Sequence, residues 1–234
     1  MYKYETRVRF SETDPDGNMT VTAIIDHFQD IATFHSEDVG AGRKVLGKRN
    51  MAWVICSWQL EILRCPVFGE KITIATKAFS FRAFTGSRNC MILNEQGEIL
   101  VRAACIWAMM DMVKGKPVNV PEDIIEKYEV EEPLDMEYLP RKIILPREGG
   151  EALERFTIQR SHIDSLGHVN NGQYIKMAAA LCGNEMPSLL RAEYKMQAHP
   201  GDVFCPVRYS LEDGEIISFF DTEGRVYASV QFYK

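Results

Sequence analysis

An internal repeat constrains the fold of this chain more than any other feature of its sequence. Residues 14–19, DPDGNM, align without a gap with residues 164–169, DSLGHV, which lie 150 positions later. Each copy follows an extended segment, 4–10 or 154–160, and precedes a segment whose apolar residues recur at the helical spacing of three and four. The repeat therefore predicts two copies of one structural unit. The apolar helix positions are Val21, Ile24, Ile25, Phe28, Ile31 and Ala32 in the first copy and Tyr174, Ile175, Ala178, Leu181 and Cys182 in the second.

Two further matches give the order of elements within each copy. Gly69-Glu70 and Gly201-Asp202 each end an extended segment and lie 132 positions apart. Residues 94–98, NEQGE, match residues 221–225, DTEGR, and both have the composition of a hairpin turn between alternating segments. Each copy is thus predicted to contain a strand, a helix and about four more strands. Because such a helix must bury its apolar face on an antiparallel sheet, we predict the α+β class.

The two copies are separated by a segment rich in proline and charge, which lies within residues 111–153. We predict an N-terminal domain at 1–115, a linker at 116–150 and a C-terminal domain at 151–234. One short helix is expected near Pro121–Tyr128, because proline is favoured at the first position of a helix.

Composition limits the classes of function that are open to the chain. With 234 residues, 46% of them apolar and 26% charged, it can bury a sizeable core as a soluble globular protein of one or two domains. The net charge of -6 argues against general nucleic-acid binding. No segment has 18 uncharged apolar residues and the first ten residues carry charges, so we expect no membrane span and a cytoplasmic location. The six cysteines form no Cys-x-x-Cys pair and are expected to be reduced and mostly in the core, Cys182 and Cys205 included.

The stretch 164–171, DSLGHVNN, is the strongest candidate for a functional site. Asp, Gly and Asn suit any turn, so the local pattern alone leaves two interpretations open: a catalytic carboxylate and imidazole, or a turn with a helix cap. The first copy has an Asp at the matching place, Asp14, but Asn18 where the second copy has His168. We therefore expect Asp14 to be structural.

This architecture and motif resemble those of the hotdog thioesterases. More narrowly, the whole chain resembles the bacterial acyl-acyl carrier protein thioesterases, a double-hotdog family related to plant plastid enzymes. The stretches that carry the resemblance are ETDPDGNMTVTAIIDHFQDIATFHSEDVG, WVICSWQLEILRCPVFGEKITIAT, LNEQGEILVRAACIW and DSLGHVNNGQYI. The resemblance implies a tandem hotdog fold, in which each half is a long helix wrapped by an antiparallel sheet.

The resemblance also implies an activity. The expected reaction is hydrolysis of fatty acyl-acyl carrier protein thioesters to free fatty acid and carrier protein, within fatty acid biosynthesis. The expected partner is acyl carrier protein with its phosphopantetheine-linked acyl chain, and no cofactor is implied. Two hotdogs in one chain complete the fold, so a monomer or a homodimer is expected.

Two positions depart from the family pattern. Plant members carry an Asn two residues after the motif's Asp, where this chain has Leu166. They also carry an acidic residue on a following strand, and the alignment through Ala192-Glu193-Tyr194-Lys195 puts Gln197 there. The resemblance thus leaves Asp164 and His168 as the catalytic pair, with Gln197 as a supporting residue.

Thioester hydrolysis needs a nucleophile and a group that holds the oxyanion, whereas the leaving thiol, with a pKa of roughly 8.5, needs little acid catalysis. Asp164 can activate water as a general base or attack directly, and His168 can orient water, Asp164 or the substrate. We favour the water route. The N–H groups of Val169, Asn170 and Asn171 at the predicted helix start are candidate oxyanion donors, and the two asparagines are equally candidate helix caps.

Other motifs predict no competing chemistry. Residues 42–48 fit the G-x-x-x-x-G-K pattern of a phosphate loop, but Arg49 replaces the Ser/Thr that binds magnesium and a helical pattern precedes it. The five histidines show no metal-ligand spacing, and no G-x-S-x-G occurs, so neither a metal site nor a serine esterase is expected. Basic residues within and directly after residues 42–48 form a patch, which either steers an acidic carrier protein or belongs to a solvated loop. Its members are Arg43, Lys44, Lys48 and Arg49.

Two alternative functions stay open. The first is an acyl-coenzyme A thioesterase, because D-x-x-G-H-V-N-N also occurs in hotdog enzymes that act on coenzyme A esters. The second is a non-catalytic acyl-binding hotdog module, which Leu166 and Gln197 at polar catalytic positions suggest. A set of aromatic residues either lines an acyl tunnel or fills a core: Trp53, Trp58, Phe79, Phe81, Phe84 and Trp107.

Overall fold

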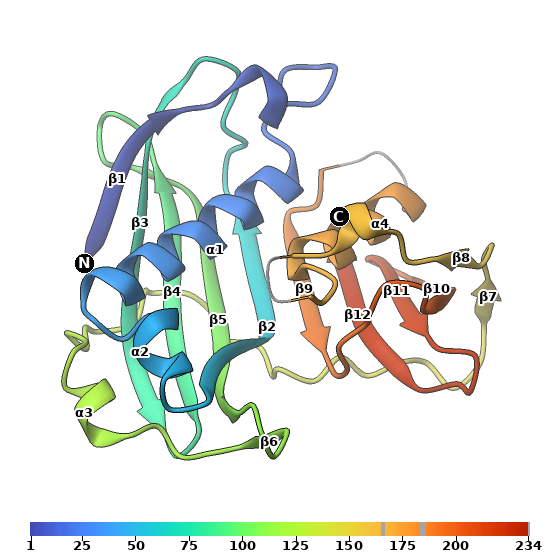
Figure 1. Ribbon diagram of the computed structural model, residues 1–234. Coiled ribbons are helices and arrows are strands. Elements are labelled where there is room, and N and C mark those ends of the chain that lie inside the picture. The colour runs from blue at the N-terminus through green and yellow to red at the C-terminus, as the bar shows by residue number, and fades with distance from the viewer. Residues whose placement is uncertain (165–166, 183–185, 234) are drawn as a thin grey trace. The chain divides into compact units, whose positions relative to one another are not determined.

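The computed structural model describes residues 1–164, 167–182 and 186–233, and the chain divides into two units (Figure 1). Unit 1 comprises Met1–Cys56 and Leu60–Tyr138. Unit 2 comprises Ser57–Gln59 and Leu139–Lys234.

Unit 1 is an antiparallel sheet with one long helix, α1 (Val21–Asp38), across its face. The strand order is β1 (Tyr2–Arg7), β3 (Lys71–Arg82), β4 (Thr85–Leu93), β5 (Ile99–Asp111) and β2 (Met51–Ile62), and the short β6 (Lys116–Pro117) pairs with β5. The helix starts after Thr20, whose side chain accepts a hydrogen bond from the N–H of Ala23. All six apolar residues predicted for its inner face are buried against the sheet. Unit 1 therefore has the predicted core.

Three short helical segments complete unit 1: the 3₁₀ helix η1 (Phe10–Glu12), α2 (Arg43–Gly47) and α3 (Glu122–Ile125). The helix α3 begins directly after Pro121, inside the range predicted for it. A second group of buried residues joins α2 and α3 to the sheet, and it consists of Ala41, Leu46, Ala78, Met109, Val120, Ile124 and Tyr128.

Unit 2 repeats this plan with shorter elements. Its strand order is β9 (Leu189–Tyr194), β12 (Val226–Tyr233), β11 (Gly214–Phe220), β10 (Val203–Leu211) and β7 (Gly150–Ala152), and β8 (Phe156–Thr157) pairs with β10. The 3₁₀ helix η2 (Arg160–His162) precedes α4 (Asn171–Leu181), which contacts β11 and β12. The ring of Tyr174 stacks on Phe204 at 5.5 Å between centroids, so aromatic rings fill the space beneath α4. Leu181 and Cys182 are only half-buried, so the buried face of α4 is narrower than predicted.

The hydrogen bonds of the two units repeat at the offsets found in the sequence. The N–H of Asp14 donates to the carbonyl of Asn18 at 2.9 Å, and that of Asp164 donates to His168 at the same distance. Each turn then needs a left-handed residue, and glycine supplies it, with φ of 83° at Gly17 and 84° at the equivalent position of unit 2. The 150-residue repeat is therefore a repeat of backbone structure.

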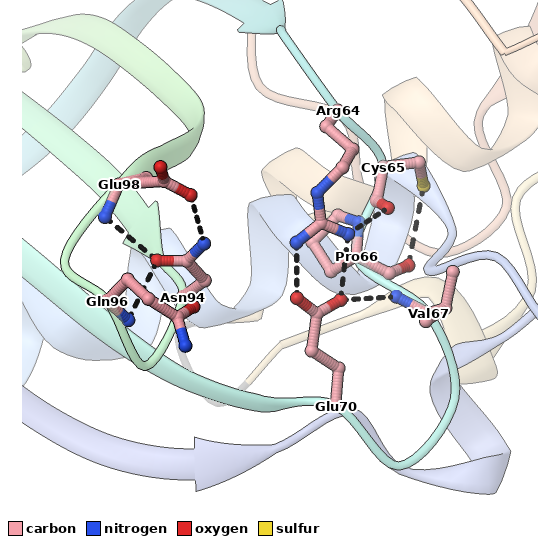
Figure 2. A network of polar contacts seen from close by, with 8 residues as sticks. All are labelled: Arg64, Cys65, Pro66, Val67, Glu70, Asn94, Gln96 and Glu98. Atoms are coloured by element: carbon pink, nitrogen blue, oxygen red, sulfur yellow. Dashed lines mark hydrogen bonds and ion pairs between the residues drawn. The ribbon is translucent and has the colours of Figure 1, made fainter.

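Figure 2 shows the second and third matches as they occur in unit 1. The side chain of Asn94 accepts hydrogen bonds from the N–H groups of Gln96 and Glu98, which closes the turn between β4 and β5. Nearby, Glu70 pairs with Arg64 and accepts a hydrogen bond from the N–H of Val67 at 3.0 Å. The guanidinium of Arg64 lowers the pKa of the Glu70 carboxyl. In unit 2, Asp221 and Asp202 make the corresponding backbone contacts, with the N–H groups of Glu223 and Arg225 and with that of His199.

The segment predicted as a linker, 116–150, is divided between the units after Tyr138. In each unit, a buried polar side chain accepts a hydrogen bond from the backbone of this segment. The side-chain oxygen of Asn89 accepts from the N–H of Leu134 at 3.0 Å in unit 1. In unit 2, the carboxylate of Glu193 accepts from the N–H of Ile143 at 3.0 Å. Since each half of the segment satisfies buried polar groups, it packs against the unit to which it belongs.

Burial corrects two expectations about individual residues. None of the six cysteines, all of which lie in the described ranges, forms a disulfide, and only Cys90 and Cys105 are buried, whereas the other four, Cys182 and Cys205 included, are half-buried. Of the aromatic set, Trp58 is buried and Phe84 is 42% exposed, and the rest are half-buried. Within the described ranges, no helix is long and apolar enough to cross a membrane.

Candidate active site

The turn that begins at Asp164 joins η2 to α4 in unit 2. An isolated antiparallel bridge between Ile163 and Val169 closes its base. Within the turn, the N–H of Gly167 donates to the carbonyl of Asp164 at 3.1 Å. Asp164 and His168 are therefore brought to the same end of the turn, directly before the helix. Leu166, which departs from the pattern of the plant relatives, lies outside the described residues, and so does Ser165.

The ring of His168 lies against a second imidazole. The ring centroids of His168 and His199 are 4.8 Å apart and the planes are tilted by 60°. Burial lowers the pKa of His168, the neighbouring His199 lowers it further, and the carboxylate of Asp164 opposes both effects. At neutral pH His168 is therefore uncharged and has a ring nitrogen that can accept a proton.

The start of α4 supplies fewer oxyanion donors than predicted. The N–H of Val169 donates to the carbonyl of Ala198 at 2.9 Å, and that of Asn170 donates to His162 at 3.0 Å. Both groups are engaged in the backbone scaffold, so Val169 and Asn170 are removed from the set of candidate donors. Asn170 is instead the N-cap, whose side chain accepts from the N–H of Gly172 at 2.8 Å. For the N–H of Asn171, the first residue of α4, the described part of the chain provides no hydrogen-bond acceptor.

The strand region that follows β9 reaches the turn from the other side. Gln197 is exposed and directly precedes Ala198, whose carbonyl is bonded to Val169. Gln197 is thus next to the turn in space. In the sequence, His199 is one of five histidines without metal-ligand spacing, and the contact between its ring and His168 comes from the pairing of these two segments. The one available signal was the repeat itself, in which Val67 occupies the position of His199.

The equivalent turn of unit 1 has the same scaffold and different chemistry. One carboxylate oxygen of Asp14 accepts from the N–H groups of Asp16 at 3.0 Å and Asn18 at 2.9 Å. The N–H of Met19 donates to the carbonyl of Pro66 at 2.8 Å, as that of Val169 does to Ala198. Asp14 therefore closes its own loop, which agrees with the structural role expected for it.

The basic patch lies on and after α2 in unit 1, and its four members are exposed. Arg49 makes two hydrogen bonds to the carboxylate of Asp123, at 2.9 and 2.6 Å, so a neighbouring charge compensates it. The N–H of Arg43 donates to Glu37 at 2.7 Å, which satisfies one donor at the start of α2. Because a carboxylate compensates the charge of Arg49, the other three members, Lys44 and Lys48 among them, are better suited to meet an acidic partner. In the described residues, no group of three or more His, Cys, Asp and Glu side chains is arranged to hold a metal ion.

Comparison with known proteins identifies the family. The family profile described as acyl-ACP thioesterase N-terminal domain matches residues 1–128, which is more than half of the chain. This chain belongs to the acyl-ACP thioesterase family. Among curated proteins, it is 24% identical over 188 residues to a chloroplastic acyl-[acyl-carrier-protein] hydrolase of Cuphea viscosissima, a match that covers 75% of this chain and 45% of the relative. The chain thus spans about half the length of the curated relatives it matches.

Solved structures of acyl-ACP thioesterases share the fold over the whole chain. An acyl-ACP thioesterase from Bacteroides thetaiotaomicron superposes with a TM-score of 0.89 at 22% identity, over 99% of this chain and 96% of that one. The 12:0-ACP thioesterase from Umbellularia californica superposes with a TM-score of 0.83 at 17% identity, again over 99% and 96%. These matches confirm the predicted α+β tandem hotdog fold.

Proposed function

We propose that this chain is a cytoplasmic thioesterase of fatty acid biosynthesis, which hydrolyses fatty acyl-acyl carrier protein to free fatty acid and carrier protein. Family membership supports the reaction class. The observation that carries the site assignment is the difference between two turns of the same backbone structure. The turn of unit 2 has His168 beside Asp164 directly before α4, whereas the turn of unit 1 has Asn18 at the position of His168.

In the proposed reaction, water attacks the thioester carbonyl. Asp164 takes the proton of the attacking water as general base, the neutral His168 orients that water, and the N–H of Asn171, at the positive end of the α4 dipole, stabilises the oxyanion. The carbon–sulfur bond then breaks, the phosphopantetheine sulfur leaves as a thiolate, and the proton held by the site neutralises it. The products are the fatty acid and the carrier protein thiol. Direct attack by Asp164 is the second route, and Gln197 supports either one from the adjacent strand region.

The two routes differ in where solvent oxygen first appears. In a single turnover with excess enzyme in heavy-oxygen water, direct hydrolysis labels only the fatty acid. Attack by Asp164 forms an acyl-aspartyl anhydride, and its hydrolysis at the aspartyl carbonyl leaves the label in that side chain. A labelled peptide containing Asp164, detected by mass spectrometry, therefore identifies attack by Asp164, and we expect an unlabelled peptide.

Thiol release from matched acyl-carrier and acyl-coenzyme A substrates tests the function. We expect Asp164→Asn and His168→Ala to remain folded, and Asp164→Asn to lose at least a hundredfold in kcat, or about 2.7 kcal/mol of transition-state stabilisation. Asp14→Asn is the matched control, because it makes the same change in the turn of unit 1 and should retain activity. Tight acyl binding without turnover by the wild type would instead identify a binding module, and a silent Asp164→Asn variant would identify a turn and cap.

The same assay tests the partner. A preference of at least tenfold for the carrier-protein substrate separates the proposed function from an acyl-coenzyme A thioesterase. If Lys44 and Lys48 steer the acidic carrier, Lys44→Glu/Lys48→Glu should raise KM for the carrier substrate several-fold and leave KM for the coenzyme A ester unchanged. Arg147→Glu, an equally exposed charge reversal in unit 2, is the control. A patch that is only a solvated loop would give equal KM values in all three proteins.

A further inference from the structure

The proposed reaction leaves one titratable side chain at the site without a role, and that side chain is His199. Its ring contacts that of His168 at 4.8 Å between centroids, although the two residues belong to segments on opposite sides of α4 in the sequence. His199 is exposed, whereas His168 is half-buried, so His199 forms the solvent side of the pair.

Hydrogen bonds fix the position of the backbone that carries this ring. The N–H of His199 donates to a carboxylate oxygen of Asp202 at 2.8 Å, and the hydroxyl of Tyr227 donates to the same oxygen at 3.2 Å. On the other side, the carbonyl of Ala198 accepts from Val169, which follows His168 directly. The contact between the rings is therefore built into the pairing of the two segments.

Unit 1 shows that the fold does not require this pair. It has the equivalent bonds, from the N–H of Val67 to Glu70 at 3.0 Å and from that of Met19 to the carbonyl of Pro66 at 2.8 Å. At the positions of His168 and His199 it nevertheless has Asn18 and Val67. Both imidazoles occur together, and only in the copy with the candidate catalytic carboxylate, so packing alone does not account for them.

We propose that His199 is a positioning residue of the thioesterase site, which acts through His168 by holding its ring. The inference rests on the proposed function of that site. The same contact disfavours the protonated form of His168, because a positive charge on its ring would lie against a second ring that can also be positively charged. An uncharged His168 keeps a ring nitrogen that can accept a hydrogen bond from the attacking water and orient it.

The charged groups around the pair act in known directions. Asp164, from the turn, favours the protonated form of His168, and His199, from the facing segment, opposes it. Behind His199 stand Asp202 and, from β12, Tyr227. Burial raises the pKa of Tyr227 to about 12, so its hydroxyl keeps its proton and continues to donate to Asp202 throughout the working pH range.

Two substitutions separate the two roles of His199. His199→Phe keeps a ring against His168 but removes the charge, and His199→Val introduces the residue that unit 1 has at this place and so is compatible with the fold. The pKa of His168 is read from the NMR signals of its ring in the full-length chain, and His27 of unit 1 serves as the internal reference. The pH profile of kcat/KM is measured on the same proteins.

We expect the pKa of His168 to rise by roughly half a unit or more in both variants, because a source of like charge is lost. The acidic limb of kcat/KM should move to higher pH by the same amount. At pH 8, where His168 is uncharged in all three proteins, His199→Phe should retain kcat within about threefold, whereas His199→Val should lose more because its ring support is gone.

The outcomes are distinguishable from failure of the proposed function because NMR requires no turnover. An unchanged pKa of His168 in both variants overturns the inference, and so does a pKa that moves while the pH profile of an active enzyme does not. If the wild type releases no thiol at any pH, the proposed function fails and the positioning role fails with it.

Discussion

The substitution Asn89→Leu tests how the segment between the two repeats is held. Asn89 lies on β4 and is completely buried. Its side-chain nitrogen donates to the carbonyl of Ala103 at 3.1 Å, and its oxygen accepts from the N–H of Leu134 at 3.0 Å and from the hydroxyl of Tyr138 at 3.1 Å. Leucine has the same branched shape, but its methyl groups are bulkier than the amide oxygen and nitrogen, so the change removes these three bonds and a weaker one to the sulfur of Met136 at 3.7 Å, and it adds volume to the site.

The loss in the free energy of unfolding depends on whether each former hydrogen-bond partner of Asn89 keeps another partner. The hydroxyl of Tyr138 belongs to an exposed residue and also donates to the carbonyl of Leu134, so it loses little. The N–H of Leu134 and the carbonyl of Ala103 are left with reduced pairing, and a buried polar group that loses its partner costs about 1–3 kcal/mol. We therefore expect Asn89→Leu to lower the free energy of unfolding by about 2–4 kcal/mol.

Urea unfolding measures this difference, and limited trypsin digestion at Lys127 and Arg141 reports whether segment 127–141 has loosened. Tyr138→Phe is the control, because it removes only the exposed hydroxyl and should cost less than about 1 kcal/mol. If Asn89→Leu costs no more than this control and digestion is unchanged, the segment is held by other contacts and our account of it is wrong.

Three further predictions concern the two turns, the buried His35 of unit 1 and the basic patch. Gly167→Ala and Gly17→Ala should each lower stability by about 1 kcal/mol in urea unfolding, since both have positive φ, but only the former should lower kcat. Burial and the neighbouring guanidinium lower the pKa of His35 to about 4, below its value in the unfolded chain. The contribution of His35 to stability is therefore complete above about pH 6.5 and is lost as the pH falls towards 4. His35→Phe should make the free energy of unfolding less dependent on pH in this range. Arg49→Ala should raise KM for the carrier substrate less than Lys44→Ala does, and equal effects would contradict the compensation of Arg49 by its ion pair.

The elements that sequence could predict are those fixed by local rules. The 3 and 4 spacing of apolar residues predicted six of the nine buried residues of α1, because that helix is long and lies across a whole sheet, and it missed Ala23, His27 and His35. For the shorter α4, the same spacing overestimated burial at Leu181 and Cys182. The offsets between the copies predicted the repeated turns at Gly17 and Gly167, since a backbone that must adopt positive φ selects glycine in both copies.

The remaining features depend on contacts between distant segments. The engagement of the Val169 N–H follows from where the carbonyl of Ala198 lies, and no local pattern in either segment specifies that distance. The packing of segment 116–150 against the two units depends on Asn89 and Glu193. These are polar residues inside strands, and their burial depends on the segment that covers them. The ring contact of His168 with His199 has the same origin.

The repeated turn also has a consequence for how this protein can change over time. Its shape is maintained by main-chain hydrogen bonds, one glycine and, in the first copy, the carboxylate of Asp14, and none of these depends on whether residue 18 or 168 is an amide or an imidazole. Substitutions at position 18 therefore leave the backbone of the first turn intact. With the proposed site in the second copy, the first copy is required only to fold, so a new side chain can be tolerated there before it has any use.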